Sequence, residues 1–161
     1  MVTISELYAL SENEWKGFFS LFRKCDEEIF HNSIYEGSWS PENIFRHLLD
    51  SLVQINNNAL LTEKLESNLT IKYNENPEDR IALDQIEEEY QRINTVIKKG
   101  MDEITAEKEN ELIKMGQREI PRVRYLIFLF AHEHNHFGQV IWILKRATKW
   151  TTDEIFKMMN E

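Results

Sequence analysis

The chain has 161 residues, 42% of them hydrophobic and 29% charged, which suits one globular domain over residues 1–161 with a buried core. Its net charge of −9, with no cluster of basic residues, argues against binding to nucleic acid or to an anionic membrane. No basic leader starts the chain and no apolar run is long enough to cross a bilayer, so we expect a cytoplasmic protein without a membrane partner.

The first part of the chain predicts one long helix. Five glycines and three prolines are too few for the many turns of an all-β fold. After a short amphipathic piece over residues 4–10, Ser11 and Glu14 match a capping box and predict the start of a helix of about 20 residues. Cys25 falls in its apolar pattern and is expected to be a buried hydrophobe, because a lone cysteine has no disulfide partner within the chain. His31 is expected on the surface at the helix end.

A second helix has a clear start signal. Ser40 suits the N-cap, Pro41 the first helical position and Glu42 the first turn. The apolar stripe that follows predicts a helix to about Leu65, and His47 lies on this stripe. An imidazole on a core face needs a hydrogen-bond partner or a metal ion.

The remainder predicts two more long helices. Residues 68–79 are interpreted as a loop, and apolar residues spaced by three and four predict a helix from Ile86 to Ile104. Residues 105–119 are polar and predict a loop or a frayed turn. Pro121 opens a helix that runs to about Thr148, and a final short helix is expected over residues 151–159. The prediction is an all-α four-helix bundle with short extra helices at its ends.

Three of the five histidines fall in the last long helix, in the segment His132-Glu133-His134-Asn135-His136. Because His132 and His136 are four residues apart, their Cβ atoms should lie about 5–6 Å from each other on one helix face, close enough to bind one metal ion. His134 points to another side and is expected at the surface. His47 is the histidine best placed to be the third ligand, from a facing helix.

Three imidazoles with open coordination positions favour zinc, nickel, iron or copper over magnesium or calcium. The same segment also satisfies His-Glu-x-x-His, in which Glu133 would be the general base of a metallopeptidase and Glu154 could be the third ligand. We rank this alternative second, because the chain lacks strands to present a peptide and His47 would be left unexplained.

Two segments together resemble a known family. Trp39-Ser40-Pro41-Glu42-Asn43-Ile44-Phe45-Arg46-His47-Leu48, followed by His-Glu-x-x-His-x-Gly-Gln from His132 to Gln139, resembles the DinB-like (YfiT-like) superfamily, which includes bacillithiol S-transferases. The resemblance implies an up-down-down-up bundle, a homodimer, and a divalent metal, zinc or nickel, bound by His47, His132 and His136. Trp39 and Gln139 could line the pocket.

This resemblance leads us to expect a metal-dependent thiol S-transferase that acts on small electrophiles in detoxification. The metal would hold the sulfur of a small thiol cofactor as a thiolate at neutral pH. Two alternatives stay open. One is a metal-dependent hydrolase with metal-activated water and Glu133 as candidate base, and the other is a non-catalytic bundle that binds metal for stability or sensing.

Overall fold

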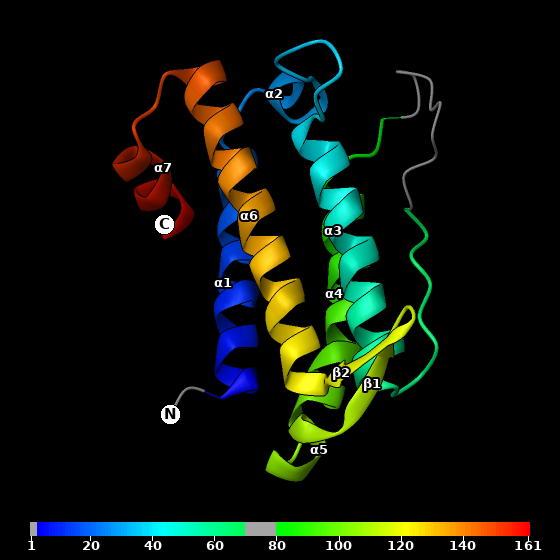
Figure 1. Ribbon diagram of the computed structural model, residues 1–161. Helices are drawn as coiled ribbons and strands as arrows, with labels where there is room; N and C mark the ends of the chain where they lie inside the picture. Colours follow the sequence, from blue (N-terminus) through cyan, green and yellow to red (C-terminus); the bar gives the residue numbers. More distant parts are fainter. Residues whose placement is uncertain (1–2, 70–79) are drawn as a thin grey trace.

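The computed structural model describes residues 3–69 and 80–161 (Figure 1). Two of its four long helices run in one direction and the other two in the opposite direction, so the predicted all-α bundle with up-down-down-up connectivity is confirmed. The long helices, in chain order, are α1 (Ile4–Phe22), α3 (Pro41–Ile55), α4 (Leu83–Asp102) and α6 (Arg122–Thr148). The shorter elements are α2 (Glu27–His31), a π-helical turn η1 (Asn56–Leu60), α5 (Ala106–Asn110), β1 (Leu112–Met115), β2 (Arg118–Pro121) and α7 (Thr152–Met159).

An aromatic core joins the four long helices. α1 and α3 each pack against both α4 and α6. Trp15 of α1 is fully buried at the centre, where its ring stacks on Tyr90 of α4 with the centroids 4.5 Å apart. The edges of two further rings meet it, Phe45 of α3 at 5.1 Å and Phe137 of α6 at 5.7 Å. One ring from each helix therefore sets how the four helices face one another.

The start of α1 differs from the prediction. The helix begins at Ile4, because Thr3 and Glu6 form the capping box: the Thr3 hydroxyl accepts the Glu6 N–H and the Glu6 carboxylate accepts the Thr3 N–H. Ser11 with Glu14 matches the same pattern, but Ser11 lies inside the helix and its hydroxyl donates to Glu133 of α6. The predicted cap at Ser11 is therefore wrong.

The predicted first helix is also interrupted. α1 ends at Phe22, and Asp26 caps the separate helix α2 by accepting the Glu28 N–H at 3.0 Å. Cys25 lies half-buried in the break, and burial raises the pKa of its thiol to about 11. His31 is not the surface residue that we expected: its side chain is 3% exposed, and its Nδ1 lies 2.7 Å from the Glu42 carboxylate. This contact ties α2 to the start of α3.

The start of α3 is confirmed, whereas its end comes earlier than predicted. Ser40 is the N-cap and its hydroxyl accepts the Asn43 N–H. The α-helix ends at Ile55 and passes directly into the π-helical turn η1, which is capped by Leu61 with a φ of 56°. The first two residues of η1 bond to the chain that follows: Asn56 donates to the Glu63 carbonyl, and Asn57 donates to the Leu65 carbonyl while accepting the Leu65 N–H. These bonds hold the chain where it turns back after η1.

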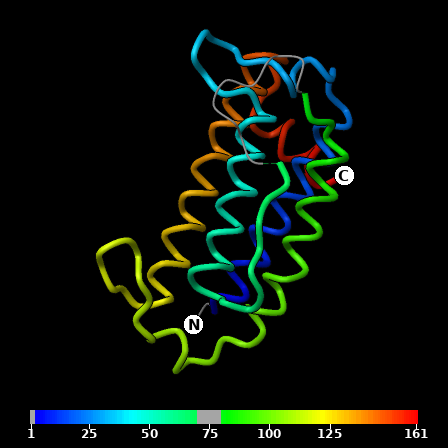
Figure 2. Tube along the Cα trace, turned by 90° about the vertical axis from the view of Figure 1, so that its right-hand side faces the viewer, coloured from blue at the N-terminus to red at the C-terminus, as the bar shows by residue number. Residues whose placement is uncertain are grey.

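Because α3 and α4 run in the same direction, the chain must return along the bundle between them. Residues 61–69 make the first part of this return beside α4 (Figure 2). The Glu89 carboxylate accepts the Asn68 N–H at 2.7 Å, and the Arg92 guanidinium donates to the Glu66 carbonyl at 2.7 Å. Most of the loop predicted over residues 68–79 lies outside the described residues.

The segment predicted as a polar loop over residues 105–119 holds the short helix α5 and most of a hairpin. β1 and β2 pair antiparallel, with Met115 opposite Arg118. The two-residue turn starts at Gly116, which has a φ of 62°. Glycine readily adopts this left-handed conformation, and the Gly-Gln pair was the local signal for the hairpin. The other predicted elements, α4, α6 and α7, are found close to their expected bounds.

Within residues 3–69 and 80–161, no helix is long and apolar enough to span a membrane. This agrees with the expectation from the sequence that no apolar run approaches the required length.

Replacing Ser40 by alanine should reduce the free energy of unfolding by about 1 kcal/mol, because the Asn43 N–H loses its acceptor at the N-cap. Urea unfolding followed by circular dichroism measures the change. Ser5→Ala is the control, since Ser5 is an exposed serine near the start of α1 that does not cap it. Equal stability of the two variants would contradict the capping role.

Candidate metal centre

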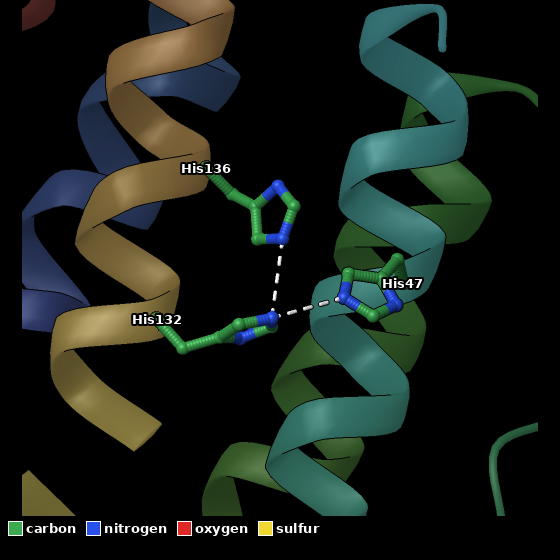
Figure 3. A group of neighbouring side chains, drawn as sticks. All are labelled: His47, His132 and His136. Atoms are coloured by element: carbon green, nitrogen blue, oxygen red, sulfur yellow. Dashed lines mark hydrogen bonds between the residues drawn. The ribbon is translucent and has the colours of Figure 1, made fainter. Parts of the chain in front are cut away.

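The three histidines expected to form a site meet between α3 and α6 (Figure 3). His47 projects from α3, and His132 and His136 project from α6, one turn apart. The Nε2 atom of His132 lies 3.2 Å from Nε2 of His47 and 3.2 Å from Nε2 of His136. Donor atoms of all three rings lie within 4.8 Å of one another. The structure thus brings together the predicted set.

This arrangement fits a divalent cation. Nitrogen ligands about 2.0–2.1 Å from a tetrahedral zinc ion lie about 3.3–3.4 Å from one another, close to the spacing of these Nε2 atoms. Without a cation, three ring nitrogens that face one another cannot all be satisfied, since a proton shared by one pair leaves the third without a partner. A cation at their centre would accept all three lone pairs.

The electrostatics of the cluster keep the rings neutral. Burial, with smaller contributions from His136 and His132, lowers the pKa of His47 from its usual 6.5 to about 4. Burial and the neighbouring His136 also lower the pKa of His132. Both rings are therefore uncharged at neutral pH, which is the form that binds a metal ion.

The two predicted pocket residues both contact His136. The Nδ1 atom of His136 lies 2.9 Å from Oε1 of Gln139, and donation to this oxygen leaves the Nε2 lone pair free for the cluster. Trp39 stacks over the His136 ring, with centroids 6.0 Å and planes 13° apart, and meets the His47 ring edge-on at 5.0 Å. Among the described residues, Nδ1 of His132 is buried without a hydrogen-bond partner. On its Nδ1 side, the His132 ring is therefore held by packing rather than by a hydrogen bond.

Glu133 does not face the cluster. It is 3% exposed and lies on the side of α6 that packs against α1, where it accepts the Ser11 hydroxyl and, at 2.5 Å, the Trp15 indole N–H. Burial raises its pKa to about 7. The general-base role considered for Glu133 is therefore not supported by its position. The sequence already indicated that Glu133 points away from its neighbour His132, because successive residues are turned by about 100° around a helix.

The alternative third ligand, Glu154, is also placed elsewhere. Its carboxylate accepts the N–H and the hydroxyl of Thr151 at 2.7 and 2.8 Å, and so caps α7. His134 lies at the surface as expected, with its side chain 76% exposed and its Nδ1 3.0 Å from the Glu14 carboxylate. In the described parts of the chain, the group of possible metal-binding atoms consists of the three histidines, and no carboxylate belongs to it.

Comparisons with known proteins agree with this fold. The sequence profile of the DinB family matches residues 1–157. The crystal structure of a DinB-like protein from Bacillus cereus ATCC 10987 superposes with a TM-score of 0.69 at 18% sequence identity, covering 90% of this chain and 93% of that chain. At this identity the likeness shows a shared fold. No match is found among curated proteins.

Replacing His47 by alanine should remove most of the bound metal, because two imidazoles from one helix hold a divalent cation less tightly than three. We expect about one equivalent of metal per chain in the native protein, measured by elemental analysis of protein purified without a histidine tag. His134→Ala is the matched control, since this exposed histidine lies outside the cluster. Metal retained by His47→Ala, or lost equally from His134→Ala, would contradict the three-histidine site.

Replacing Glu133 by glutamine should remove a dependence of stability on pH. The Glu133 carboxyl group holds its proton up to a pKa of about 7 in the folded protein, but only to 4.5 in the unfolded chain. The folded state thus binds more protons between these values, so the free energy of unfolding of the native protein should fall as the pH rises from about 5 to about 8. In Glu133→Gln, the part of this decrease in the free energy of unfolding that is due to Glu133 should be absent.

Urea unfolding at both pH values, with a chelator present, measures the effect. Glu36→Gln, a substitution at an exposed residue in the connection between α2 and α3, is the control and should behave like the native protein. The same fall in native protein and Glu133→Gln would show that Glu133 is already ionised in the folded state.

Proposed function

This chain belongs to the DinB family, and we propose that it is a metal-dependent S-transferase that joins a small thiol to electrophilic molecules. The observation that carries the proposal is the convergence of three Nε2 atoms, 3.2 Å apart in two of the pairs, beside an accessible tryptophan. His47, His132 and His136 would hold zinc or nickel. When bound, such a cation is a Lewis acid with open positions that lowers the pKa of a small thiol.

Two residues around the cluster would orient a ligand and contact the substrate. Gln139 keeps the His136 ring turned so that its Nε2 atom points to the cluster. Trp39 is 41% exposed and forms an aromatic wall against which a substrate can pack while one side stays open to solvent. All three ligands are neutral, so the charge of a bound cation is left to be balanced by an anionic sulfur.

The placement of Glu133 favours thiol transfer over hydrolysis. A hydrolase that used Glu133 as its base would need this carboxylate beside the attacking water, and the described residues place no carboxylate in the donor group. Glu133 instead accepts hydrogen bonds from Ser11 and Trp15 of α1. A thiolate is already a nucleophile and needs no base at the moment of attack.

In the proposed reaction the thiol first loses its proton to solvent. The sulfur then attacks the electrophilic carbon, so that a carbon–sulfur bond forms with the sulfur electron pair. The bond from this carbon to the leaving group breaks, and the leaving group departs with the electrons of that bond. No oxidant or reductant takes part.

We further propose a homodimer, as the resemblance implies, and a cytoplasmic location, as expected from the sequence. A groove of about 550 Å³ between α1, α6 and α7 supports association with a second copy, because the exposed side chains of Leu10, Ile127 and Phe156 line it. The residues that line this groove include Glu133 and His134 and none of the three metal histidines. A partner seated there would leave the cluster open.

Replacing His136 by alanine should reduce the conjugation of chlorodinitrobenzene to the uncatalysed rate, because the cluster loses a ligand. The assay supplies cysteine, glutathione and bacillithiol in turn to metal-loaded protein and follows the absorbance of the product. His134→Ala should retain the native rate, since its side chain points to solvent. Metal-loaded native protein that gives only background rates with every thiol would refute the proposal.

Two other outcomes would identify the alternatives. Turnover of an ester or amide without any thiol, lost in His136→Ala, would indicate hydrolysis. A large drop in thermal stability on chelation, without activity in any assay, would indicate a non-catalytic metal-binding bundle.

A further inference from the structure

A strip of exposed aromatic side chains extends from the metal cluster along α6. Its members are Trp39, Tyr35 and Trp142, and they are 41%, 46% and 48% exposed. Trp39 stacks on His136, and the Tyr35 ring lies 5.8 Å from that of Trp142. Tyr35 and Trp39 belong to the connection between α2 and α3, so this connection follows α6 from Trp142 to the cluster. We call these three residues the aromatic strip.

Arg146 lies at the far end of the aromatic strip. Its guanidinium carbon is 5.9 Å from the centre of the Tyr35 ring and 5.7 Å from that of Trp142, and the group donates a hydrogen bond to the Tyr35 hydroxyl. Across residues 3–69 and 80–161 no carboxylate forms an ion pair with Arg146, although the chain carries a net charge of −9. Two rings and a hydroxyl hold this cation in place, and most of its five N–H donors are left for a ligand.

The spacing along α6 sets the size of a molecule that could contact both the metal cluster and Arg146. Trp142 follows His136 by six residues, about 9 Å along the helix axis, and Arg146 follows it by ten, about 15 Å. Gln139 lies between them, on the same side of the helix as His136. A small molecule bound at the cluster could therefore lie along the aromatic strip and reach Arg146.

We propose that the aromatic strip and Arg146 recognise the substrate of the cluster as a small molecule with a flat unsaturated group and an anionic group. The flat group packs on the aromatic strip, and the carboxylate, sulfonate or phosphate binds Arg146, whose guanidinium carbon lies 5.7 Å from the centre of the Trp142 ring. The anion belongs either to the electrophile or to the thiol. The claim that this molecule is a reactant rests on the proposed S-transfer, whereas its binding to the aromatic strip and Arg146 does not.

The test compares two ligands of similar shape, one anionic and one neutral. Naphthalenesulfonate is anionic and a poor metal ligand, and methyl naphthyl sulfone is its neutral counterpart. The indole N–H signals of the four tryptophans report binding by nuclear magnetic resonance, after assignment with Trp39→Phe and Trp142→Phe. The sulfonate should shift the Trp142 and Trp39 signals but not that of buried Trp15.

The native protein should bind the sulfonate more tightly than the sulfone. Arg146→Gln should weaken sulfonate binding about tenfold, the effect of losing one charged hydrogen bond, and leave sulfone binding unchanged. Lys145→Gln is the matched control, because it removes one positive charge from the adjacent residue, whose amine donates to Thr152. Equal binding of the two ligands, the same loss in Lys145→Gln, or shifts confined to Trp150 would overturn the proposal.

Transfer assays then identify which reactant carries the anion. If the electrophile carries it, Arg146→Gln raises the KM of an anionic electrophile and leaves that of the thiol unchanged. If the thiol carries it, the reverse holds, and no change in either KM would overturn the role in substrate recognition. The binding measurement contains no thiol, so it can succeed even where the S-transferase proposal fails.

Discussion

The packing of Phe137 against the aromatic core determines the rotation of α6, and the rest of the site depends on it. Phe137 is fully buried, with its ring 4.9 Å from Phe18 and 5.7 Å from Trp15. Its large apolar surface can be buried in one orientation of the helix only. With Phe137 turned inward, the neighbouring His132 and His136 face α3, and Glu133 faces α1. A rotation of one residue position, about 100°, would separate the histidines from His47.

Glu133, His132 and His136 of α6 each have a hydrogen-bond partner at this depth. The buried Glu133 carboxyl group accepts two hydrogen bonds from α1, which offset part of the cost of removing it from water. The histidines meet one another instead, and burial lowers the pKa of His47 and of His132, so a proton on either ring is disfavoured. A cluster that disfavours protons yet presents three lone pairs is suited to a metal ion.

One helix therefore carries three kinds of chemistry on different sides. The side toward α3 presents His132 and His136, the side toward α1 joins the core, and the C-terminal part presents Arg146 beside the aromatic strip. The connection between α2 and α3 completes the surface, since it supplies both Trp39 at the cluster and Tyr35 at the arginine. The contact between His31 and Glu42 attaches α2, which precedes this connection, to the first turn of α3. The proposed substrate surface thus depends on contacts that are remote from the three histidines.

The sequence by itself determined the local features. Helical periodicity predicted the long helices, the Ser40-Pro41-Glu42 signal predicted the start of α3, and the spacing of His132 and His136 placed them on one face, because each depends on residues within a few positions. Only the tertiary structure determined which of the local patterns form in the folded chain. Ser11 matched a cap but bonds Glu133, 122 positions away, and His47 meets His132 across 85 positions. Such contacts depend on how helices pack and on the rotation of each helix, which no local pattern contains.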